Sequence, residues 1–245
     1  MMVELILVEG VSDVQLISYY LQNVYGWKYE KDKVLGVTAL DGYEHIESLS
    51  KDDNKLILCG VGGIEKFAHF VSNHRINDMI IERDISSVMV VTDRDEASDA
   101  KIKRKINDSF DNISFNVAEW TPNMIIDSFK QSKNVNTYLL IIPENENGAL
   151  ERVIINALND IPEEKNLIQE VTNFIDSLKL ELVPDLTQVN KSNKATVGTF
   201  FSVRNPQNAM RAFSIIISKI DWSKSESIRK LFMPFTFLGQ EKPIS

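Results

Sequence analysis

Three times in the first half of the chain, a short apolar run ends at glycine or beside aspartate, and a helical pattern follows. The runs span residues 3–8, 55–60 and 87–92. Spacings of three and four place the apolar residues that follow on one helix face, while runs rich in β-branched residues suit strands buried on both sides. Because such crossovers almost always connect parallel neighbours, the pattern predicts an α/β fold with a mainly parallel sheet flanked by helices.

A further apolar run at residues 137–143 predicts a fourth strand, and residues 27–40 favour an inserted hairpin. After Pro143 the pattern becomes helical, with prolines between the helical segments. No long linker rich in Gly, Ser and Pro separates the two halves. We therefore expect an α/β core at residues 1–142 and a mainly helical extension at residues 143–245, packed on the core. The helices of the extension are expected within residues 148–158, 163–180, 205–220 and 225–238.

Charge is unevenly distributed along the chain. The net charge of −8 argues against a protein that coats duplex nucleic acid without specificity, since that affinity comes from many Lys and Arg. Residues 186–245 carry nine basic and three acidic side chains, whereas the first 185 residues carry 18 basic and 32 acidic ones. An acidic body could hold metal and a basic end could hold phosphate; ordinary solvated faces are the alternative interpretation.

Several classes of protein are disfavoured by the sequence. The chain has no run of about 18 apolar residues and no signal-peptide pattern, so we expect a cytoplasmic protein without a membrane segment. Its single cysteine, Cys59, lies in an apolar run and is expected to be a buried core residue. A zinc site would need His45, His69 and His74, which we interpret as ordinary helix or surface residues. The segment "GVGGIE" at residues 60–65 has glutamate where a dinucleotide-binding loop needs glycine.

Acidic residues follow two of the predicted strands. Glu9 comes after the first strand, and Asp93 and Asp95 come after the third. In open α/β sheets ligands bind beyond the carboxyl ends of the strands, so these side chains are candidates for one site. Asp13 lies at the start of the first helix, where Ser12 is a candidate N-cap. Taken singly, a structural role is an equally good interpretation of Asp13, as an ordinary first-turn acid, and of Asp95. Ligands that are all oxygen suit Mg²⁺ or Mn²⁺ rather than zinc.

The order of these motifs resembles a known domain. An apolar strand that ends in "VEGVSD" (residues 8–13), a middle unit of strand, glycines and helix, and then "TDRDE" (residues 92–96) are similar to the Toprim domain, and most of all to its OLD-type nuclease version. The later segments "IIPENENGALERVI", "NKATVGTFFSVRNP" and "IDWSKSESIRKLF" resemble blocks of a small, poorly characterised Toprim-related family. The resemblance covers nearly the whole chain and implies a Toprim-like core with a four-stranded sheet.

The resemblance also implies roles for individual residues. Glu9 corresponds to the glutamate beside the metal, which acts as a ligand or as a general acid and base. Asp93 and Asp95 correspond to Mg²⁺ ligands, and Asp13 corresponds to a residue that helps to hold a second metal. Mg²⁺, or Mn²⁺ in its place, is therefore the implied cofactor.

Two later residues have less specific counterparts. Glu151 corresponds to an additional carboxylate ligand, with an exposed acid in the first helical turn as the alternative. Lys194, or else Lys191, corresponds to a lysine that faces the charge developing on phosphate, with a solvated lysine as the alternative. The chain departs from the family by lacking a P-loop sequence, so the ATPase that is fused to OLD nucleases is absent from it, and any ATPase would be a separate partner protein.

Two functions remain open from the sequence. The first is Mg²⁺-dependent cleavage of phosphodiesters, as in a nuclease that acts on DNA or RNA. The second is a noncatalytic module that binds nucleotide or metal, or a subunit that acts only with a partner protein. The overall acidity and the lack of a clear basic groove keep the second open.

Overall fold

The computed structural model describes residues 2–31, 44–110, 112–127, 129–178, 182–209 and 213–242. The chain divides into two compact units. Unit 1 comprises Met1–Thr92, Ala97–Ile141 and Pro234–Ser245, and unit 2 comprises Asp93–Glu96 and Ile142–Met233. The two units are not separated by a single break in the sequence. Residues 93–96 belong to unit 2, and residues 234–245 belong to unit 1. The boundary predicted between residues 142 and 143 stays a prediction.

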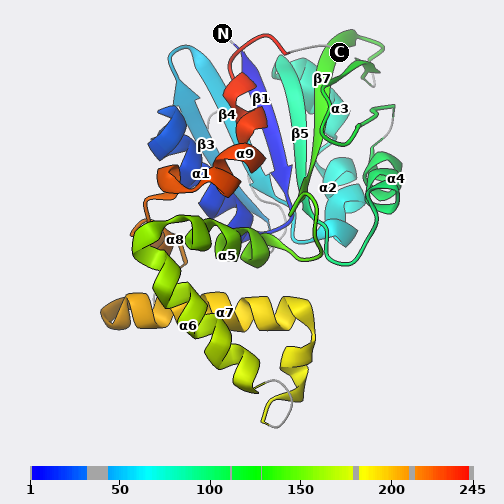
Figure 1. Ribbon diagram of the computed structural model, residues 1–245. Helices are drawn as coiled ribbons and strands as arrows, with labels where there is room; N and C mark the ends of the chain where they lie inside the picture. The colour runs from blue at the N-terminus through cyan, green and yellow to red at the C-terminus, as the bar shows by residue number, and fades with distance from the viewer. Residues whose placement is uncertain are drawn as a thin grey trace. The chain divides into compact units, whose positions relative to one another are not determined.

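Seven strands form one mixed sheet among the described residues, in the order β2-β3-β4-β1-β5-β7-β6. Its centre is parallel, because β1 pairs in parallel with β4 and with β5 (Figure 1). The pairs β2–β3, β3–β4 and β6–β7 are antiparallel. The strands are β1 (Val3–Val8), β2 (Lys28–Glu30), β3 (His45–Lys51), β4 (Asn54–Gly60), β5 (Ile85–Asp93), β6 (Thr121–Ile126) and β7 (Ser132–Ile142).

The prediction of an α/β fold is confirmed, but the predicted number of strands in the sheet, four, is too low. The four predicted strands are present as β1, β4, β5 and β7, and the sheet gains β2, β3 and β6. These three strands carry many polar or exposed residues, and β6 is an edge strand that contains Pro122, so none has the continuous apolar run of a buried strand. Most of the hairpin predicted at residues 27–40 lies outside the described residues.

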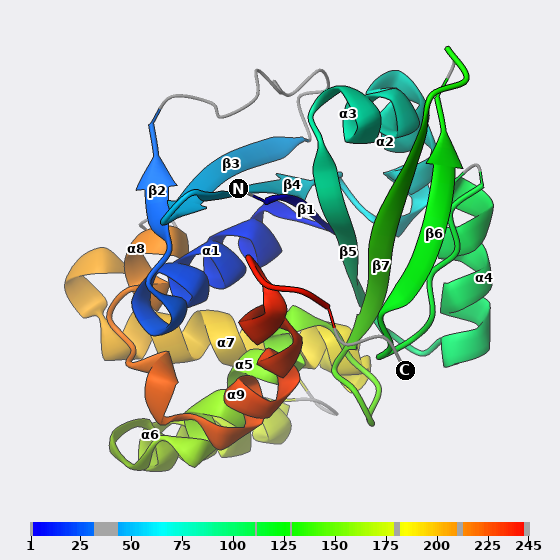
Figure 2. The same ribbon diagram turned by 90° about the horizontal axis from the view of Figure 1, so that it is seen from above.

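Helices cover both faces of the sheet in unit 1. Alternate β1 residues, Leu5 and Leu7, belong to one apolar core with Phe67, Ile80 and Ile106 from the helices on that face. Figure 2 shows α1 on the opposite face, where it contacts β3 and β4. The helices of this unit are α1 (Val11–Tyr25), the short η2 (Ile64–Lys66), α2 (Phe67–Asn73), α3 (Ile76–Glu82) and α4 (Asp99–Ser109).

Unit 2 is helical, as predicted for the second half of the chain. Its central helix α5 contacts α6, α7 and α9, and each of these helices has a buried face. Helix α7 was not predicted. No helix in the described ranges is both long and apolar enough to cross a membrane. The helices are α5 (Leu150–Asp160), α6 (Pro162–Leu178), η3 (Pro184–Thr187), α7 (Val189–Arg204), η4 (Pro206–Asn208), α8 (Phe213–Ile217), η5 (Trp222–Lys224), α9 (Glu226–Leu231) and η6 (Met233–Phe237), whose last residues belong to unit 1.

Candidate functional site

In unit 1, Glu9 follows β1 where that strand lies beside β5. The parallel register places Val8 opposite Val91. The Glu9 carboxylate accepts hydrogen bonds on both oxygens, from the Thr92 hydroxyl on Oε1 and from the Ile64 amide on Oε2 at 3.2 Å. Thr92 is the next residue along β5, so the end of the neighbouring strand fixes the orientation of the Glu9 side chain.

The glycine segment after β4 folds onto the main chain of Glu9. The amides of Gly62 and Gly63 donate to the Glu9 carbonyl oxygen at 2.9 and 2.8 Å. Both glycines have φ values of the left-handed region, 90° and 113°, which other residues adopt only at a cost. Gly62 and Gly63 therefore let the chain turn back onto the main chain of Glu9.

Asp13 caps the first helix of unit 1. Its Oδ2 accepts a hydrogen bond at 2.8 Å from the amide of Gly10, which is the N-cap residue of α1. The prediction of Ser12 as the N-cap is wrong, because helix α1 already begins at Val11. The Asp13 side chain is buried and interacts with the first turn of its own helix, the place where an acid is stabilised by the helix dipole.

In unit 2, Asp93 meets the first residue of α5. Its Oδ1 accepts a hydrogen bond at 3.0 Å from the amide of Leu150. That amide belongs to the group of unpaired donors at a helix N-terminus, and Ala149, the N-cap residue, has no side chain that could bind it. Asp93 thus accepts a hydrogen bond from the N-terminus of α5, and this bond holds its carboxylate at the end of β5.

Asp95 is held in an unusual conformation by three hydrogen bonds. Its φ is 50°, in the left-handed region. Its amide donates to the Gly148 carbonyl at 2.7 Å, and its carbonyl accepts from the Gly148 amide at 2.9 Å. Its carboxylate Oδ1 accepts from Nδ2 of Asn190, on α7, at 2.6 Å.

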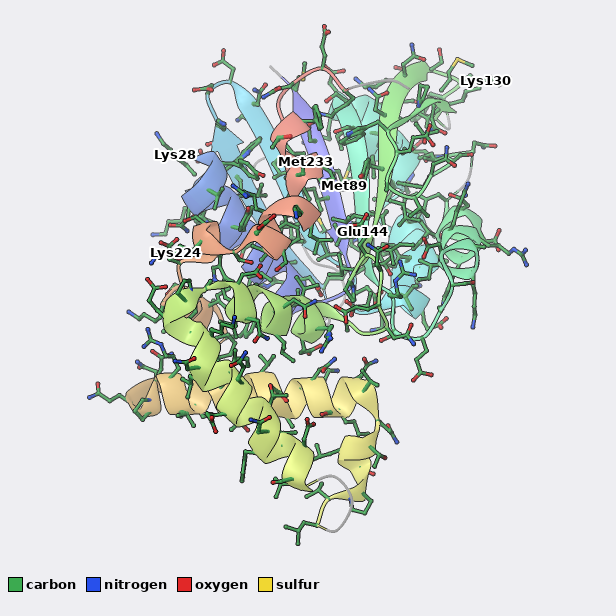
Figure 3. All side chains as sticks on the ribbon, in the orientation of Figure 1. Lys28, Met89, Lys130, Glu144, Lys224 and Met233 are labelled. Atoms are coloured by element: carbon green, nitrogen blue, oxygen red, sulfur yellow. The ribbon has the colours of Figure 1, made fainter. Side chains whose placement is uncertain are left out.

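Arg94, between the two aspartates, ties the same segment to the loop after β7. Its amide donates to the Ile142 carbonyl at 2.7 Å, and its Nε donates to the Pro143 carbonyl at 2.9 Å. The guanidinium also donates to the carbonyl of Glu144, a residue labelled in Figure 3. Three consecutive residues, Asp93, Arg94 and Asp95, are therefore fixed by contacts within unit 2.

Glu151 and Lys194 also belong to unit 2 but have no such contacts. Glu151 is half-buried in the first turn of α5, and Lys194 is exposed on α7. Neither side chain has a hydrogen bond or ion pair with another described residue. The alternative lysine, Lys191, binds Asp185 at 2.9 Å.

The six predicted site residues thus fall into two groups. Glu9 and Asp13 belong to unit 1; the other four belong to unit 2 and are Asp93, Asp95, Glu151 and Lys194. Within the part of the chain that the structure describes, no three or more Asp, Glu, His and Cys side chains are grouped so as to hold a metal ion. Mg²⁺, however, is commonly bound by one or two carboxylates with water and substrate phosphate completing the shell, and the oxygen donors of Asp93 and Asp95 are of that kind.

Three further polar residues were not identified from the sequence: Thr92, Asn190 and Asn193. Thr92 is the next-to-last residue of the apolar strand β5, and its contact with Glu9 depends on strand register. Asn190 lies 95 positions from its partner Asp95, on a helix that the sequence did not predict. The one available signal was the spacing of three between the two asparagines, which places them on one helix face.

Unit 2 also contains a pocket of about 340 Å³, lined by the loop after β7, α5 and α9. Glu146 is oriented there by Arg152 Nε at 2.7 Å and by Asn156 Nδ2 at 2.5 Å. Lys230 contributes a cation and Leu231 an apolar surface. The described lining includes none of the six predicted site residues.

The histidines and the cysteine have ordinary environments. His45 and His74 bind Glu47 and Glu44 at 3.2 and 3.1 Å, and His69 binds Asn73 at 2.7 Å. Cys59 is fully buried in β4, as predicted. Burial, and secondly the nearby Glu44 charge, raise the pKa of the Cys59 thiol.

Comparisons with known proteins identify a family and a fold. A family model described as "Protein of unknown function (DUF3226)" matches residues 3–235. The crystal structure of hypothetical protein PH0156 from Pyrococcus horikoshii OT3 is similar over 98% of this chain and 96% of that one, with a TM-score of 0.54 and 18% sequence identity. At that identity the likeness concerns the fold alone. No curated protein matches the sequence.

Proposed function

We propose a function for this chain, which belongs to the DUF3226 family of proteins of unknown function: Mg²⁺-dependent cleavage of phosphodiesters, as a nuclease that acts on DNA or RNA. The observation that carries the proposal is the Asp93–Asp95 pair at the end of β5. Both carboxylates accept hydrogen bonds from neutral N–H donors, Leu150 and Asn190, which hold them in fixed orientations. Anionic oxygen ligands in fixed positions are what Mg²⁺ requires.

Asp93 and Asp95 would hold the metal. Bound there, Mg²⁺ would supply Lewis-acid chemistry, polarising a phosphate and making water a better nucleophile. The protein's own contribution would be to orient both carboxylates: the first amide of α5 binds Asp93, and the Asn190 amide binds Asp95.

The remaining roles rest on the resemblance to OLD-type Toprim nucleases. We assign Glu9 as a further ligand or as the general acid and base, and Asp13 to a second metal. Glu151 is assigned as an additional ligand, and Lys194 as the cation that faces phosphate charge. We further propose a cytoplasmic location, a nucleic-acid partner and a separate ATPase or other protein partner.

A cleavage assay tests the proposal. Labelled single- and double-stranded DNA and RNA are incubated with the protein in Mg²⁺, in Mn²⁺ and with EDTA. We expect cleavage that depends on the metal. In Asp93→Asn and in Asp95→Asn the cleavage rate should fall by more than the roughly 10- to 100-fold loss that is typical when an outer-shell residue is replaced. Glu9→Gln is tested separately. Glu170→Gln, which removes an exposed charge from α6, is the matched control and should cleave normally. Cleavage that survives both aspartate substitutions would contradict the assignment.

A noncatalytic module is the second candidate, and a specific observation favours it. The carboxylate of Glu9 uses both oxygens within the protein, and Asp13 caps its own helix. Residues engaged in this way stabilise unit 1 without any metal. If no nucleic acid is cleaved with or without partner proteins, while Mn²⁺ still binds and Asp95→Asn abolishes that binding, the metal-binding module is the better account.

A further inference from the structure

Asp95 has a backbone conformation that requires an explanation. A left-handed φ in a residue other than glycine costs free energy and persists only where the surroundings impose it, most often at functional sites. Here two main-chain hydrogen bonds to Gly148, at 2.7 and 2.9 Å, impose it. The direction in which the Asp95 side chain leaves the main chain is therefore set by this bridge.

Gly148 cannot be replaced freely. Its φ is 140°, and a Cβ at this position would lie 2.8 Å from Cβ of Arg152 on α5. The bridge to Asp95 thus depends on a glycine, and the conformations of Gly148 and Asp95 are linked.

Helix α7 presents two amides toward this bridge. Asn190 donates to Oδ1 of Asp95 at 2.6 Å. Asn193 follows three positions later, on the same helix face, and is 8% exposed. Its Nδ2 is buried without a hydrogen-bond partner among the described residues and lies 3.6 Å from the position of a Cβ on Gly148.

The contact to Asp95 leaves half of the carboxylate available. Asn190 occupies Oδ1, and no described residue donates to Oδ2. An amide donor is neutral, so it fixes the side chain without cancelling its charge, whereas Lys or Arg would compete with a cation. Outer-shell donors commonly orient carboxylate ligands in this way and strongly affect metal affinity.

We propose that Asn190 is a positioning residue for Asp95: it fixes the carboxylate so that the remaining oxygen is presented to a divalent cation. This inference rests on the proposed function, since it takes Asp95 as a metal ligand. It adds that helix α7, which follows Asp95 by about ninety residues, sets the affinity of that ligand.

The test measures Mn²⁺ binding by the electron paramagnetic resonance signal of free Mn²⁺, in the full chain without substrate. We expect Asn190→Ala to weaken binding by about 10-fold or more. Asn190→Gln, which keeps the amide donor, should recover most of the affinity. Asn159→Ala is the matched control on α5, because its amide bonds only the Ile155 carbonyl, and it should bind as the wild type does.

The outcomes separate this inference from the proposed function. If Asp95→Ala abolishes Mn²⁺ binding while Asn190→Ala leaves it unchanged, the positioning role is overturned and the metal assignment stands. If Asp95→Ala has no effect on binding, the metal assignment itself fails, and the positioning role fails with it. Melting temperatures are measured in parallel. If folded Asn190→Ala binds Mn²⁺ as tightly as the wild type and only its melting temperature is lower, Asn190 is a structural contact. That result would overturn the proposal.

Discussion

At the scale of single residues, the most fully buried charge in unit 1 is unrelated to the candidate site. Glu4 lies in β1 with no exposed surface and accepts hydrogen bonds from Ser87 at 2.9 Å and from the Gly239 amide at 2.7 Å. Its ion-pair partner is Lys242, whose side chain is 3% exposed. The ammonium of Lys242 also lies 5.1 Å from the centre of the Trp120 ring. Gly239 and Lys242, near the end of the chain, are thereby bound to the first strand, β1.

Lys242→Met should lower the free energy of unfolding by about 3–5 kcal/mol, because it leaves the Glu4 charge buried without a counter-charge. Urea denaturation measures the change. Lys230→Met is the control: Lys230 pairs with Glu226 at the surface, where both side chains are well exposed, and its loss should change stability little. Similar effects of the two substitutions would contradict the importance of burial here.

Cys59 should be chemically inert in the folded protein. Burial, with a smaller effect of Glu44, raises the pKa of its thiol, and the thiolate is the reactive species. A thiol reagent such as dithionitrobenzoate should therefore modify Cys59 in 6 M urea but not in native buffer. Fast modification of the native protein would show that β4 opens far more readily than a core strand should.

At the scale of elements, the sequence predicted those strands and helices whose apolar residues have a clear period. Strands β1, β4 and β5 are apolar on both faces, and α5 has a well-defined apolar stripe. Helix α7 was missed because its sequence mixes threonine, valine, serine and glycine and is only weakly amphipathic. Packing against α5 and α6 stabilises it despite modest propensity.

Two glycines of unit 2 should respond oppositely to alanine. Gly148→Ala places a Cβ against Arg152 at a positive φ and should destabilise the protein by about 1–3 kcal/mol. Gly198→Ala lies in α7 with nothing within 4 Å of the new Cβ, and alanine there should stabilise by about 0.5–1 kcal/mol. Thermal and urea unfolding measure both. A tolerated Gly148→Ala would argue against the rigid bridge to Asp95.

The junction of α5 and α9 should depend on pH. Asp160 accepts from the Ser227 amide at 2.7 Å and from the Ser225 hydroxyl at 3.0 Å. Burial tends to raise the pKa of Asp160, but hydrogen bonds from Ser227, Ser225 and Glu226 together outweigh it and hold this pKa below its ordinary value. Because the pKa of Asp160 is lower in the folded protein than in the unfolded one, its carboxylate stabilises the fold above the pKa of the unfolded state, about 4. This stabilisation is lost as the pH falls through the pKa of the folded state.

Asp160→Asn should therefore lower the free energy of unfolding at pH 7, by at most about 1 kcal/mol because the carboxylate is largely exposed. The difference from wild type should shrink as the pH falls below about 4. Urea denaturation at pH 7 and pH 3 measures both values. A difference that stays the same at pH 3 would rule out the carboxylate charge as its cause.

At the scale of the whole molecule, the sequence located acidic residues better than it located their partners. Glu9, Asp93 and Asp95 follow from a local rule, since the carboxyl ends of parallel strands carry ligands. Their actual contacts do not follow from such a rule. Thr92 reaches Glu9 through strand register, and Asn190 reaches Asp95 through the tertiary packing of a helix nearly a hundred residues later.

Binding of a divalent cation by Asp93 and Asp95 can be seen directly by anomalous diffraction from crystals soaked in Mn²⁺. We predict a Mn²⁺ peak within bonding distance, about 2 Å, of carboxylate oxygens of both Asp93 and Asp95, and no peak at that position in Asp95→Asn crystals. A well-diffracting soaked crystal with no anomalous peak at these aspartates, or with Mn²⁺ bound only elsewhere, would contradict it.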